Sequence, residues 1–402
     1  MKKSLFLLFL FLIFYSCSIF RPRIRLNQGG AKQDSYYESV SFDYIKDKII
    51  LPVTINGKVR RFIFDTGAPT IISESLQREL QYDTLGEEQV SDVHRNKGSA
   101  TFVKTGSMFL GDVEFNNVPA LVNDLSVLPW NCFQVDGFIG SNLLRNSVIQ
   151  INTDKREFIL ASESEKLQDL DKATAMRLDR QSSPYIKFGV TGDENKYFLF
   201  DSGSDDFVNI SLGYFKKLQK YHQPFDIKKT GYGNGIMGLF GTGKQGKVYR
   251  LKLDSLHFGH TIIKDPVVEV TNTSDKLGAE LLEYGTLTLD YRNEKFYFFS
   301  EEQILPFEEE QEPELGFRPV LRQDTLRVGL VWEHSLVDSL GLEPGNEIIR
   351  INKYHFRDSL RDSFCKLLLN DSLLHSEIFD IRFIDEQGNF KRIKMRRKTD
   401  NN

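Results

Sequence analysis

The chain has 402 residues, of which 27% are charged and 40% are apolar, the composition of a folded globular protein and not of a disordered one. This length is enough for two or three domains. The formal net charge is only −4 at pH 7, so the charge balance excludes a strongly basic protein of the kind that binds nucleic acid.

The N-terminus has the pattern of a targeting segment. Two lysines precede an apolar run over residues 5–14, which ends shortly before Ser16 and Cys17. This run matches the hydrophobic region of a signal peptide and is too short to span a bilayer. A small residue followed by cysteine resembles the lipobox of bacterial lipoproteins, so residues 1–17 are expected to be a lipoprotein signal peptide. The alternative is an ordinary secreted protein in which the cysteine is incidental.

Lipidation at Cys17 would fix the place of the protein in the cell. Acyl chains on the new N-terminal cysteine would anchor it to a membrane. The resemblance to lipoproteins therefore implies a location in the bacterial cell envelope, and we expect the outer membrane, with the folded part facing the periplasm.

The three cysteines show no local pattern. Cys17, Cys132 and Cys365 lie far apart and form no C-x-x-C pair. Neither a zinc site nor a disulfide framework is therefore predicted.

Changes in composition divide the rest of the chain. Two segments have short alternating apolar runs broken by Gly, Asn and Asp, which is typical of β-rich domains. Polar or acidic stretches separate them from each other and from a last domain. The expected divisions are a tether over 18–41, a first β-rich lobe over 42–162, a linker over 163–174, a second lobe over 175–300, an acidic linker over 301–312 and a C-terminal domain over 313–397.

The two β-rich segments repeat one pattern. Residues 62–67 read Phe-Ile-Phe-Asp-Thr-Gly, and residues 198–203 read Phe-Leu-Phe-Asp-Ser-Gly. A glycine follows each motif at nearly the same distance, and after it the two segments align without a gap. An internal repeat of this kind predicts two similar lobes related by a pseudo-twofold axis. The aligned positions after the glycines include Ile149, Ile151 and Asn152 in the first segment and Leu287, Leu289 and Asp290 in the second.

The repeat also predicts chemistry. A pseudo-twofold axis would bring Asp65 and Asp201 together at the ends of two buried strands. Two such carboxylates cannot both ionise, so the pair would hold one proton and could activate a water without a metal or cofactor. Gly67 and Gly203 would allow the tight turns. The hydroxyls of Thr66 and Ser202 would lock the turns across the interface.

These motifs resemble those of the aspartic peptidases of the pepsin and retropepsin type. The resemblance rests on Asp65–Gly67, Asp201–Gly203 and the element Asp136–Gly140, and it extends over about residues 42–300. It implies a mainly β protein with two retropepsin-like β-barrel lobes, related by the pseudo-twofold axis, in one chain. It also implies that Asp65 and Asp201 form a catalytic dyad that hydrolyses peptide bonds in polypeptide substrates.

The second lobe differs from the first near its aspartate. It has Lys276-Leu277-Gly278 where the first lobe has two apolar residues and a glycine. Asp205 and Asp206 closely follow Asp201, and their negative charge is expected to raise its pKa. The hydroxyl of Ser204 is placed where it can bond the carboxylate. We therefore predict an activity optimum in the mildly acidic to neutral range.

The resemblance implies that a β-hairpin flap closes over the substrate. The first lobe offers residues 97–102, and the second offers the glycine-rich stretch 231–241. The alternative is that these are surface hairpins without a role in substrate binding. The candidate flap residues are Gly98, Tyr232, Met237 and Phe240.

The C-terminal domain resembles a PDZ domain, a β-sandwich-like fold with two helices. Leu315, Gly316 and Phe317 match the carboxylate-binding loop of that family, and residues 341–352 match its central hairpin. PDZ domains bind an extended peptide as an added strand at a sheet edge. The resemblance implies capture of peptide termini or strands, and the alternative is a domain that only packs against the lobes.

Three functions follow from these patterns. The leading hypothesis is a membrane-anchored aspartic endopeptidase whose PDZ domain presents peptide substrates. The main alternative is a catalytically weak or inactive envelope protein that binds peptides with the same cleft and PDZ groove. In the third, the catalytic pair would form between the first lobes of two chains, and the second lobe would be structural.

Overall fold

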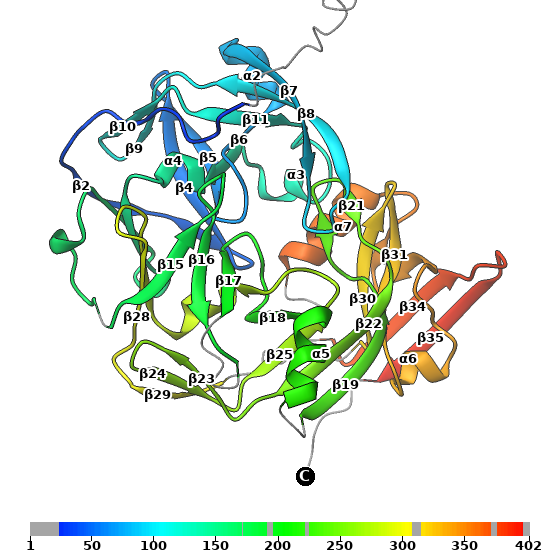
Figure 1. Ribbon diagram of the computed structural model, residues 1–402. Helices are drawn as coiled ribbons and strands as arrows, with labels where there is room; N and C mark the ends of the chain where they lie inside the picture. The colour runs from blue at the N-terminus through cyan, green and yellow to red at the C-terminus, as the bar shows by residue number, and fades with distance from the viewer. Residues whose placement is uncertain are drawn as a thin grey trace, which may run out of the picture.

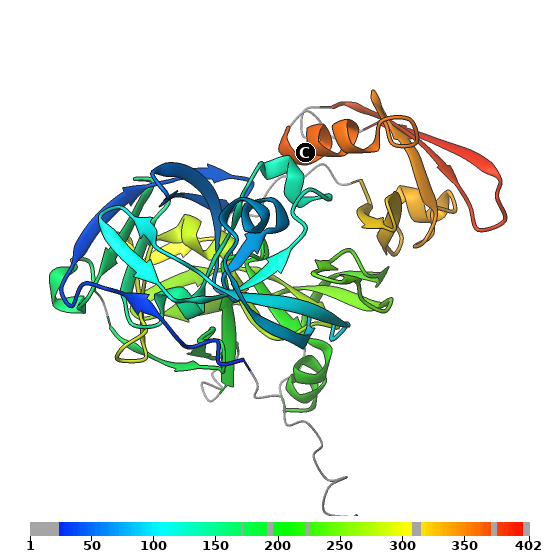
Figure 2. The ribbon, with the colours of Figure 1, turned by 90° about the horizontal axis from the view of Figure 1, so that it is seen from above.

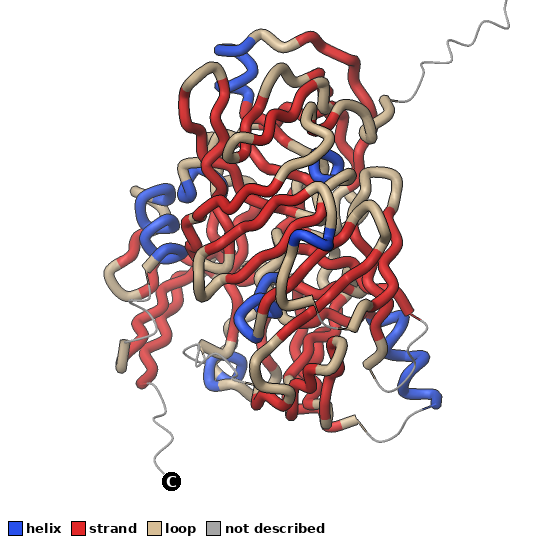
Figure 3. Tube along the Cα trace, turned by 90° about the vertical axis from the view of Figure 1, so that its left-hand side faces the viewer, coloured by secondary structure: helices blue, strands red, loops and turns tan. Residues whose placement is uncertain are grey.

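The computed structural model describes residues 24–170, 172–190, 196–221, 225–307, 315–370 and 376–396. Strands are its main secondary structure, and the helices are short (Figure 3). The expected signal peptide and Cys17 lie outside these residues, so both stay predictions. Within the described part, no helix has the length and apolar character needed to cross a membrane.

Residues 30–144 form the first lobe, the upper part of Figure 1. It contains one mixed sheet, in which β5 pairs in parallel with β12 and β12 pairs antiparallel with β6. Its elements are β1 (Gly30–Ala31), β3 (Asp43–Ile45), β4 (Lys48–Ile55), β5 (Lys58–Asp65), β6 (Ile71–Ser73), α2 (Glu74–Leu80), β7 (Asp83–Ser91), β8 (Lys97–Lys104), β9 (Met108–Leu110), β10 (Val113–Asn116), β11 (Pro119–Asn123), α3 (Trp130–Phe133), β12 (Gly137–Gly140) and α4 (Ser141–Leu144).

The second lobe, below it in Figure 1, repeats this order of elements. Here β17 pairs in parallel with β26, and β26 pairs antiparallel with β18, so the repeat in the sequence is also a repeat in topology. Its elements are β16 (Pro184–Phe188), β17 (Lys196–Asp201), β18 (Val208–Ser211), α5 (Leu212–Tyr221), β19 (Asp226–Gly233), β20 (Met237–Gly238), β21 (Gly241–Thr242), β22 (Gly246–Lys252), β23 (Ser255–Phe258), β24 (Thr261–Lys264), β25 (Val267–Thr271), β26 (Lys276–Gly278), η2 (Ala279–Tyr284) and β29 (Ile304–Pro306).

A sheet shared by both lobes joins them. Its centre is the antiparallel pair of β13 and β27, in which Ile149 faces Leu289 and Ile151 faces Leu287. In the sequence repeat, Ile149 is equivalent to Leu287 and Ile151 is equivalent to Leu289. The two pairs are therefore related to each other by the pseudo-twofold axis, which passes between β13 and β27. The strands of this sheet are, in spatial order, β2 (Tyr37–Ser41), β14 (Glu157–Ala161), β13 (Val148–Asn152), β27 (Thr286–Asp290), β28 (Lys295–Phe299) and β15 (Thr174–Leu178).

Two expected boundaries differ from the structure. Part of the expected tether, 18–41, is folded, because β2 pairs along its full length with β14 and β1 pairs with β10. Residues 304–306 of the expected acidic linker form β29, which pairs with β24. In β2, Ser39 and Ser41 are exposed while the backbone pairs in a sheet, so composition alone suggests a tether. In β29 the three residues are apolar, and the acidic residues around them concealed the short strand in the sequence. The helical turn η1 (Ser164–Lys166) lies in the expected linker between the lobes.

The strands that lead to the two aspartates differ in how far they are buried. In β5, Phe62 and Phe64 belong to the main core, whereas Ile63 belongs to a separate apolar cluster. In β17, Phe198 and Phe200 are equally buried, but Leu199 between them is only partly buried. Burial on both faces therefore explains the continuous apolar run of β5.

The C-terminal domain has its own apolar core and lies beside the two lobes (Figure 2). It is a β-rich unit with two helices, of which α7 turns toward the first lobe. Its elements are β30 (Phe317–Arg322), β31 (Thr325–Trp332), α6 (Leu336–Ser339), β32 (Glu347–Ile351), β33 (Tyr354–His355), α7 (Leu360–Leu369), β34 (Ile378–Ile384) and β35 (Phe390–Arg396).

Strand pairing attaches this domain to the second lobe. The end of β31 pairs antiparallel with the end of β19, so that Gly231 faces Trp332 and Gly233 faces Leu330. A side chain at Gly233 would collide with the Gly329 carbonyl oxygen, because its Cβ would lie 2.1 Å away. The glycine-rich stretch of the second lobe therefore allows a close approach between two backbones.

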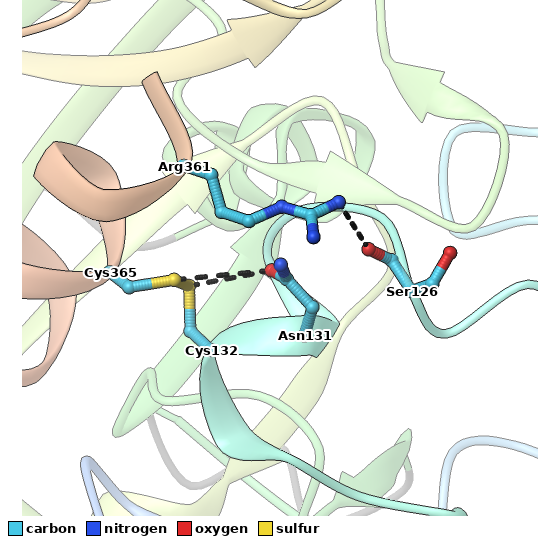
Figure 4. The surroundings of a disulfide bond; sticks show 5 residues. All are labelled: Ser126, Asn131, Cys132, Arg361 and Cys365. Carbon is cyan, nitrogen blue, oxygen red and sulfur yellow. Dashed lines mark hydrogen bonds between the residues drawn. A yellow bond between two sulfur atoms is a disulfide. The ribbon is translucent and has the colours of Figure 1, made fainter. Parts of the chain in front are cut away.

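A disulfide attaches the same domain to the first lobe, which corrects the expectation from cysteine spacing. Cys132 in α3 is bonded to Cys365 in α7, across 233 positions of sequence (Figure 4). Beside it, Arg361 donates to the Ser126 carbonyl oxygen at 3.0 Å. Spacing motifs report only local pairs, whereas this bond depends on two helices brought together by the tertiary fold.

Loss of this disulfide should loosen the C-terminal domain. We expect the double variant Cys132→Ser/Cys365→Ser to unfold at lower temperature, with a loss of about 2–5 kcal/mol in unfolding free energy. Calorimetry with and without reductant measures the effect, and the reductant should change the parent but not the double variant. Alkylation of both cysteines in the unreduced, denatured parent would contradict the bond.

Candidate active site

Each predicted catalytic aspartate ends a strand and starts a tight turn. Asp65 is the last residue of β5 and lies beside Gly140 of β12, and Asp201 is the last residue of β17 and lies beside Gly278 of β26. Each carboxylate accepts a hydrogen bond from the glycine two residues later. The distances are 2.9 Å from Gly67 N to Asp65 Oδ1 and 3.2 Å from Gly203 N to Asp201 Oδ1.

The two turns face each other so closely that only glycine fits. A Cβ built on Gly67 would lie 2.5 Å from Asp201 Oδ1, and one built on Gly203 would lie 2.5 Å from Asp65 Oδ2. Each carboxylate therefore lies against the opposite turn, and the predicted aspartates are brought together. Neither glycine is explained by its φ angle, so the close approach accounts for both residues.

Two buried hydroxyls lock the turns to each other. Thr66 Oγ1 donates to the Phe200 carbonyl oxygen at 2.5 Å and accepts from Ser202 N at 3.0 Å. In return, Ser202 Oγ donates to the Phe64 carbonyl oxygen at 3.1 Å and accepts from Thr66 N at 3.0 Å. The four bonds place Thr66 and Ser202 where the sequence predicted them, across the lobe interface.

The glycines that cross beneath the turns are also required by space. A Cβ at Gly140 would lie 2.2 Å from the carbonyl carbon of Pro69, and one at Gly278 would lie 1.9 Å from the Asp206 carbonyl oxygen. The two strands keep the same register, because Ile139 faces Phe64 and Leu277 faces Phe200. Lys276 therefore does not displace β26, although it replaces an apolar residue.

Asp65 differs from an isolated carboxylate in its protonation. Burial and, after it, the charge of Asp201 raise the pKa of Asp65 to about 7, against the opposing effects of the Gly67 N–H and the Lys48 ammonium. Both aspartates nevertheless keep part of their surface exposed, so water can reach them. A pair that holds one proton combines a base and an acid at one site.

The residues after Asp201 do not act as the sequence suggested. Ser204 Oγ donates to Asp206 Oδ2 at 3.1 Å and so does not serve the Asp201 carboxylate. The Lys276 ammonium lies 3.1 Å from the same Asp206 oxygen, and it neutralises the charge that we expected to act on Asp201. Burial raises the pKa of Asp206, but the charges of Lys276 and Arg318, together with the hydrogen bonds from Lys276 and Ser204, outweigh it and hold that pKa below its ordinary value.

Two hairpins meet beside this site, one from each lobe. The tip of the β7–β8 hairpin carries Asp92, whose Oδ2 accepts from Phe240 N at 3.1 Å. His94 Nε2 lies 3.0 Å from the Ile236 carbonyl oxygen, and Asn96 Nδ2 donates to the Thr242 carbonyl oxygen at 3.4 Å. The hairpins are thus joined in the structure by three polar contacts, which we name the flap junction.

The candidate flap residues divide between two surroundings. Gly98 and Phe240 lie together at the flap junction, where a Cβ on Gly98 would be 2.4 Å from the Phe240 ring. Met237 instead packs against the core of the C-terminal domain. Tyr232 lies in the strand that pairs with β31 and is 48% exposed. Met237 and Tyr232 therefore contact or adjoin the C-terminal domain.

The predicted carboxylate-binding loop forms the entrance to β30. Gly316 has a φ of +75°, which favours glycine, and its carbonyl oxygen accepts from Trp332 N at 2.9 Å. Phe317 is buried in the core of the C-terminal domain, and Leu315 packs against that core. The loop thus adopts a fixed turn, and its apolar residues face the domain interior.

Sequence reasoning missed the flap junction and one contact to the turn. Asp92 bonds the backbone N–H groups of His94 and Asn96, an arrangement that short polar residues favour at turns. Gln181, at the turn between β15 and β16, donates to the Gly67 carbonyl oxygen at 3.0 Å. No sequence motif indicates the flap junction or the Gln181 contact, because each joins residues more than a hundred positions apart. In the residues that the structure describes, no group of three or more His, Cys, Asp or Glu side chains is arranged to hold a metal.

Removing one hydroxyl from the interface should destabilise the fold. In Thr66→Val, the Ser202 N–H and the Phe200 carbonyl lose a buried partner, and we expect a loss of about 2–4 kcal/mol in unfolding free energy. Thr66→Ser keeps the hydroxyl and should retain most of it. Denaturant unfolding measures both variants. Because Thr66→Val keeps the methyl group and lacks the hydroxyl, a valine variant as stable as the parent would contradict the role of the hydroxyl.

Comparison with known proteins gives one family match and several distant structural ones. Residues 51–143, which include Asp65-Thr66-Gly67 and Gly140, match a protein-family model described as aspartyl protease. Comparison with curated protein sequences gives no match.

Three solved structures illustrate the structural likeness. A retropepsin-like aspartic protease from Rickettsia conorii is 20% identical, with 32% of this chain and 95% of that chain covered and a TM-score of 0.24. Basic 7S globulin from soybean is 11% identical (66% and 94% covered, TM-score 0.35), and conglutin gamma, a basic 7S globulin from lupine seeds, is 12% identical (67% and 96% covered, TM-score 0.37). Likenesses this distant support no conclusion about function. By sequence, residues 51–143 are similar to aspartyl protease domains.

Proposed function

We propose that this protein is an aspartic endopeptidase that hydrolyses peptide bonds with Asp65 and Asp201 as its dyad. The observation that carries the proposal is the reciprocal placement of the two carboxylates, each against the glycine turn of the other lobe. The aspartyl protease match over residues 51–143 supports it for the first lobe. For the second lobe, the proposal is supported by the same tight turn and by the hydroxyl of Ser202, which makes the same hydrogen bonds across the interface as Thr66 does.

The mechanism follows from one shared proton. Asp201, in its ionised form, accepts a proton from a water held between the carboxylates, and that water attacks the carbonyl carbon of the peptide bond. Asp65, in its protonated form, donates to the carbonyl oxygen as it gains charge. Collapse of the tetrahedral intermediate returns a proton to the leaving amine, and no covalent enzyme intermediate forms.

Polypeptide substrates are expected to lie extended beneath the two hairpins. In the structure the two hairpins are joined to each other, by Asp92 to Phe240 and by His94 to Ile236. If they cover the dyad as a flap, a peptide chain has to separate or thread this flap junction before it reaches the aspartates. The closed hairpins would then exclude bulk water from the reaction, as mobile loops do in many hydrolases.

For the C-terminal domain we propose a role in substrate handling, on the strength of its sequence resemblance to PDZ domains. Its contacts with both lobes favour the alternative of a packing role: the disulfide joins it to the first lobe, and β31 joins it to the second. An ion pair between Arg318 and Glu269 adds to the second contact. Attachment to an envelope membrane through Cys17 is likewise a proposal from sequence alone.

Exchange of either aspartate should abolish cleavage. We expect Asp65→Asn and Asp201→Asn each to lower the rate of peptide hydrolysis by at least about 10²–10⁴-fold, since each removes a group that moves a proton. Asp83→Asn, a change at an exposed carboxylate in β7, is the matched control and should keep the parent rate. A mixed peptide library read by mass spectrometry measures all three.

The outcomes of this experiment separate the alternatives. Loss of cleavage with Asp65→Asn but not with Asp201→Asn would place the site between the first lobes of two chains. Absence of cleavage by the parent over the whole pH range would favour the peptide-binding alternative.

The raised pKa of Asp65 predicts how the protein responds to pH. Cleavage should decline as pH rises through about 7, because the proton that Asp65 donates is then lost. The folded state also binds this proton more tightly than the unfolded state, so the contribution of Asp65 to stability should fall between about pH 4 and pH 7. Asp65→Asn should remove this part of the pH dependence in thermal unfolding curves. An Asp65→Asn curve parallel to that of the parent would contradict it.

A further inference from the structure

The second lobe buries a lysine immediately beside the turn that carries Asp201. Lys276 lies in β26 and is only 3% exposed. The equivalent position of the first lobe holds Phe138, which is equally buried but apolar. Removing an ammonium group from water is costly unless partners compensate for it. The groups that contact Lys276 therefore decide whether the cost of its burial is compensated.

Both direct partners belong to the turn that follows Asp201. The Lys276 ammonium donates to Ser204 Oγ at 2.6 Å and pairs with Asp206 Oδ2 at 3.1 Å. Ser204 N in turn donates to the Asp201 carbonyl oxygen at 3.0 Å. The cation is thus fixed at the back of the catalytic turn, two hydrogen bonds from the Asp201 backbone.

Packing alone does not require this ion pair. The first lobe builds the same strand crossing with Phe138, in the same register and without a charge. Replacement of a buried ion pair by apolar residues is often neutral or stabilising. The pair also breaks the symmetry of the strand crossing, since it places a cation in β26 where β12 has an aromatic ring. The buried cation that acts on Asp65, Lys48, comes from a different strand, β4, and has no carboxylate in the turn that follows Asp65.

We propose that Lys276 is a positioning residue that makes the dyad asymmetric: its buried charge favours the ionised form of Asp201 and so leaves the shared proton on Asp65. This inference rests on the proposed function, since it assigns the roles of base and acid within the same pair. Asp206 holds Lys276 in place and partly offsets its charge.

The other charged groups around the dyad are the same in the parent and in variants at Lys276 and Asp206. Asp205 lies in the same turn, with an exposed side chain 4.0 Å from the buried Lys48 ammonium of β4. The opposing turn contributes Asp65 itself. Other titratable or charged groups that interact with these residues are Tyr185 of β16, His94 of the β7–β8 hairpin, Arg318 of β30 and Asp47, which precedes β4 and acts on Lys48 and Asp205.

Four variants of the full chain test the sign of the effect. Lys276→Met leaves the Asp206 charge without its counterion. Both limbs of the pH profile of kcat/KM should then shift to higher pH by about one unit. On the acid limb, this shift corresponds to about a tenfold change in kcat/KM at a given pH. Asp206→Asn leaves the cation unopposed, and the limbs should shift to lower pH. The double variant Lys276→Met/Asp206→Asn should return close to the parent, and Lys276→Arg should retain the parent profile.

Opposite shifts in the two single variants are the result that supports the proposal. If Lys276 has only a structural role, the variants should have lower kcat/KM values while the limbs of the pH profile stay at the same pH. This result would overturn the proposal, and so would shifts of both single variants in the same direction. If Lys276→Met fails to fold, Asp206→Asn and the double variant still give the predicted shift and its reversal.

A second measurement separates this proposal from the proposed function. Carboxyl carbon NMR of labelled aspartate follows the ionisation of Asp65 and Asp201 without any substrate. If the parent cleaves no peptide but the two titrations move as predicted in the variants, the endopeptidase fails and the role of Lys276 stands. If the parent cleaves and the titrations do not move, the role of Lys276 is wrong.

Discussion

The contact between two glycine turns at the lobe interface constrains most of this protein. Four bonds of Thr66 and Ser202 hold the turns together, and each turn receives the carboxylate of the other lobe. Such a contact tolerates little displacement, because buried donors and acceptors would lose their partners. The shared sheet meets this requirement: the pairing of Ile149 with Leu289 and of Ile151 with Leu287 fixes the lobes on one axis.

The sequence predicted this centre well because its constraints are local. A buried strand, an aspartate, a hydroxyl residue and a glycine are adjacent in the chain, and their repetition in the two lobes indicates the twofold relation. The crossing glycines Gly140 and Gly278 were equally visible, since close approach leaves no choice of residue. The mainly β architecture followed from the short alternating runs on either side.

Features that depend on distant partners were not predictable in this way. The bond between Cys132 and Cys365 joins two helices that carry no shared motif. The sequence predicts that Asp206 adds a negative charge near the dyad. It does not indicate the partner that neutralises this charge, because Lys276 lies in another strand. The polar residues of β2 suggested a tether, although their backbone completes a sheet. In each case the missing information was the identity of the neighbour in space, which a single sequence does not contain.

The attachments of the C-terminal domain restrict how a substrate can enter. A disulfide fixes this domain to the first lobe, and its β31 is paired with β19, the strand that leads into the hairpin of the second lobe. Met237 of that hairpin is packed against the same domain. The second hairpin therefore cannot open without disturbing a covalently attached unit. The β7–β8 hairpin contacts the second hairpin through polar groups of Asp92, His94 and Asn96 and through apolar contacts with Leu239 and Phe240. Because neither a disulfide nor a strand pairing among the described residues joins it to that hairpin, we infer that the β7–β8 hairpin is the one that moves to admit a peptide chain.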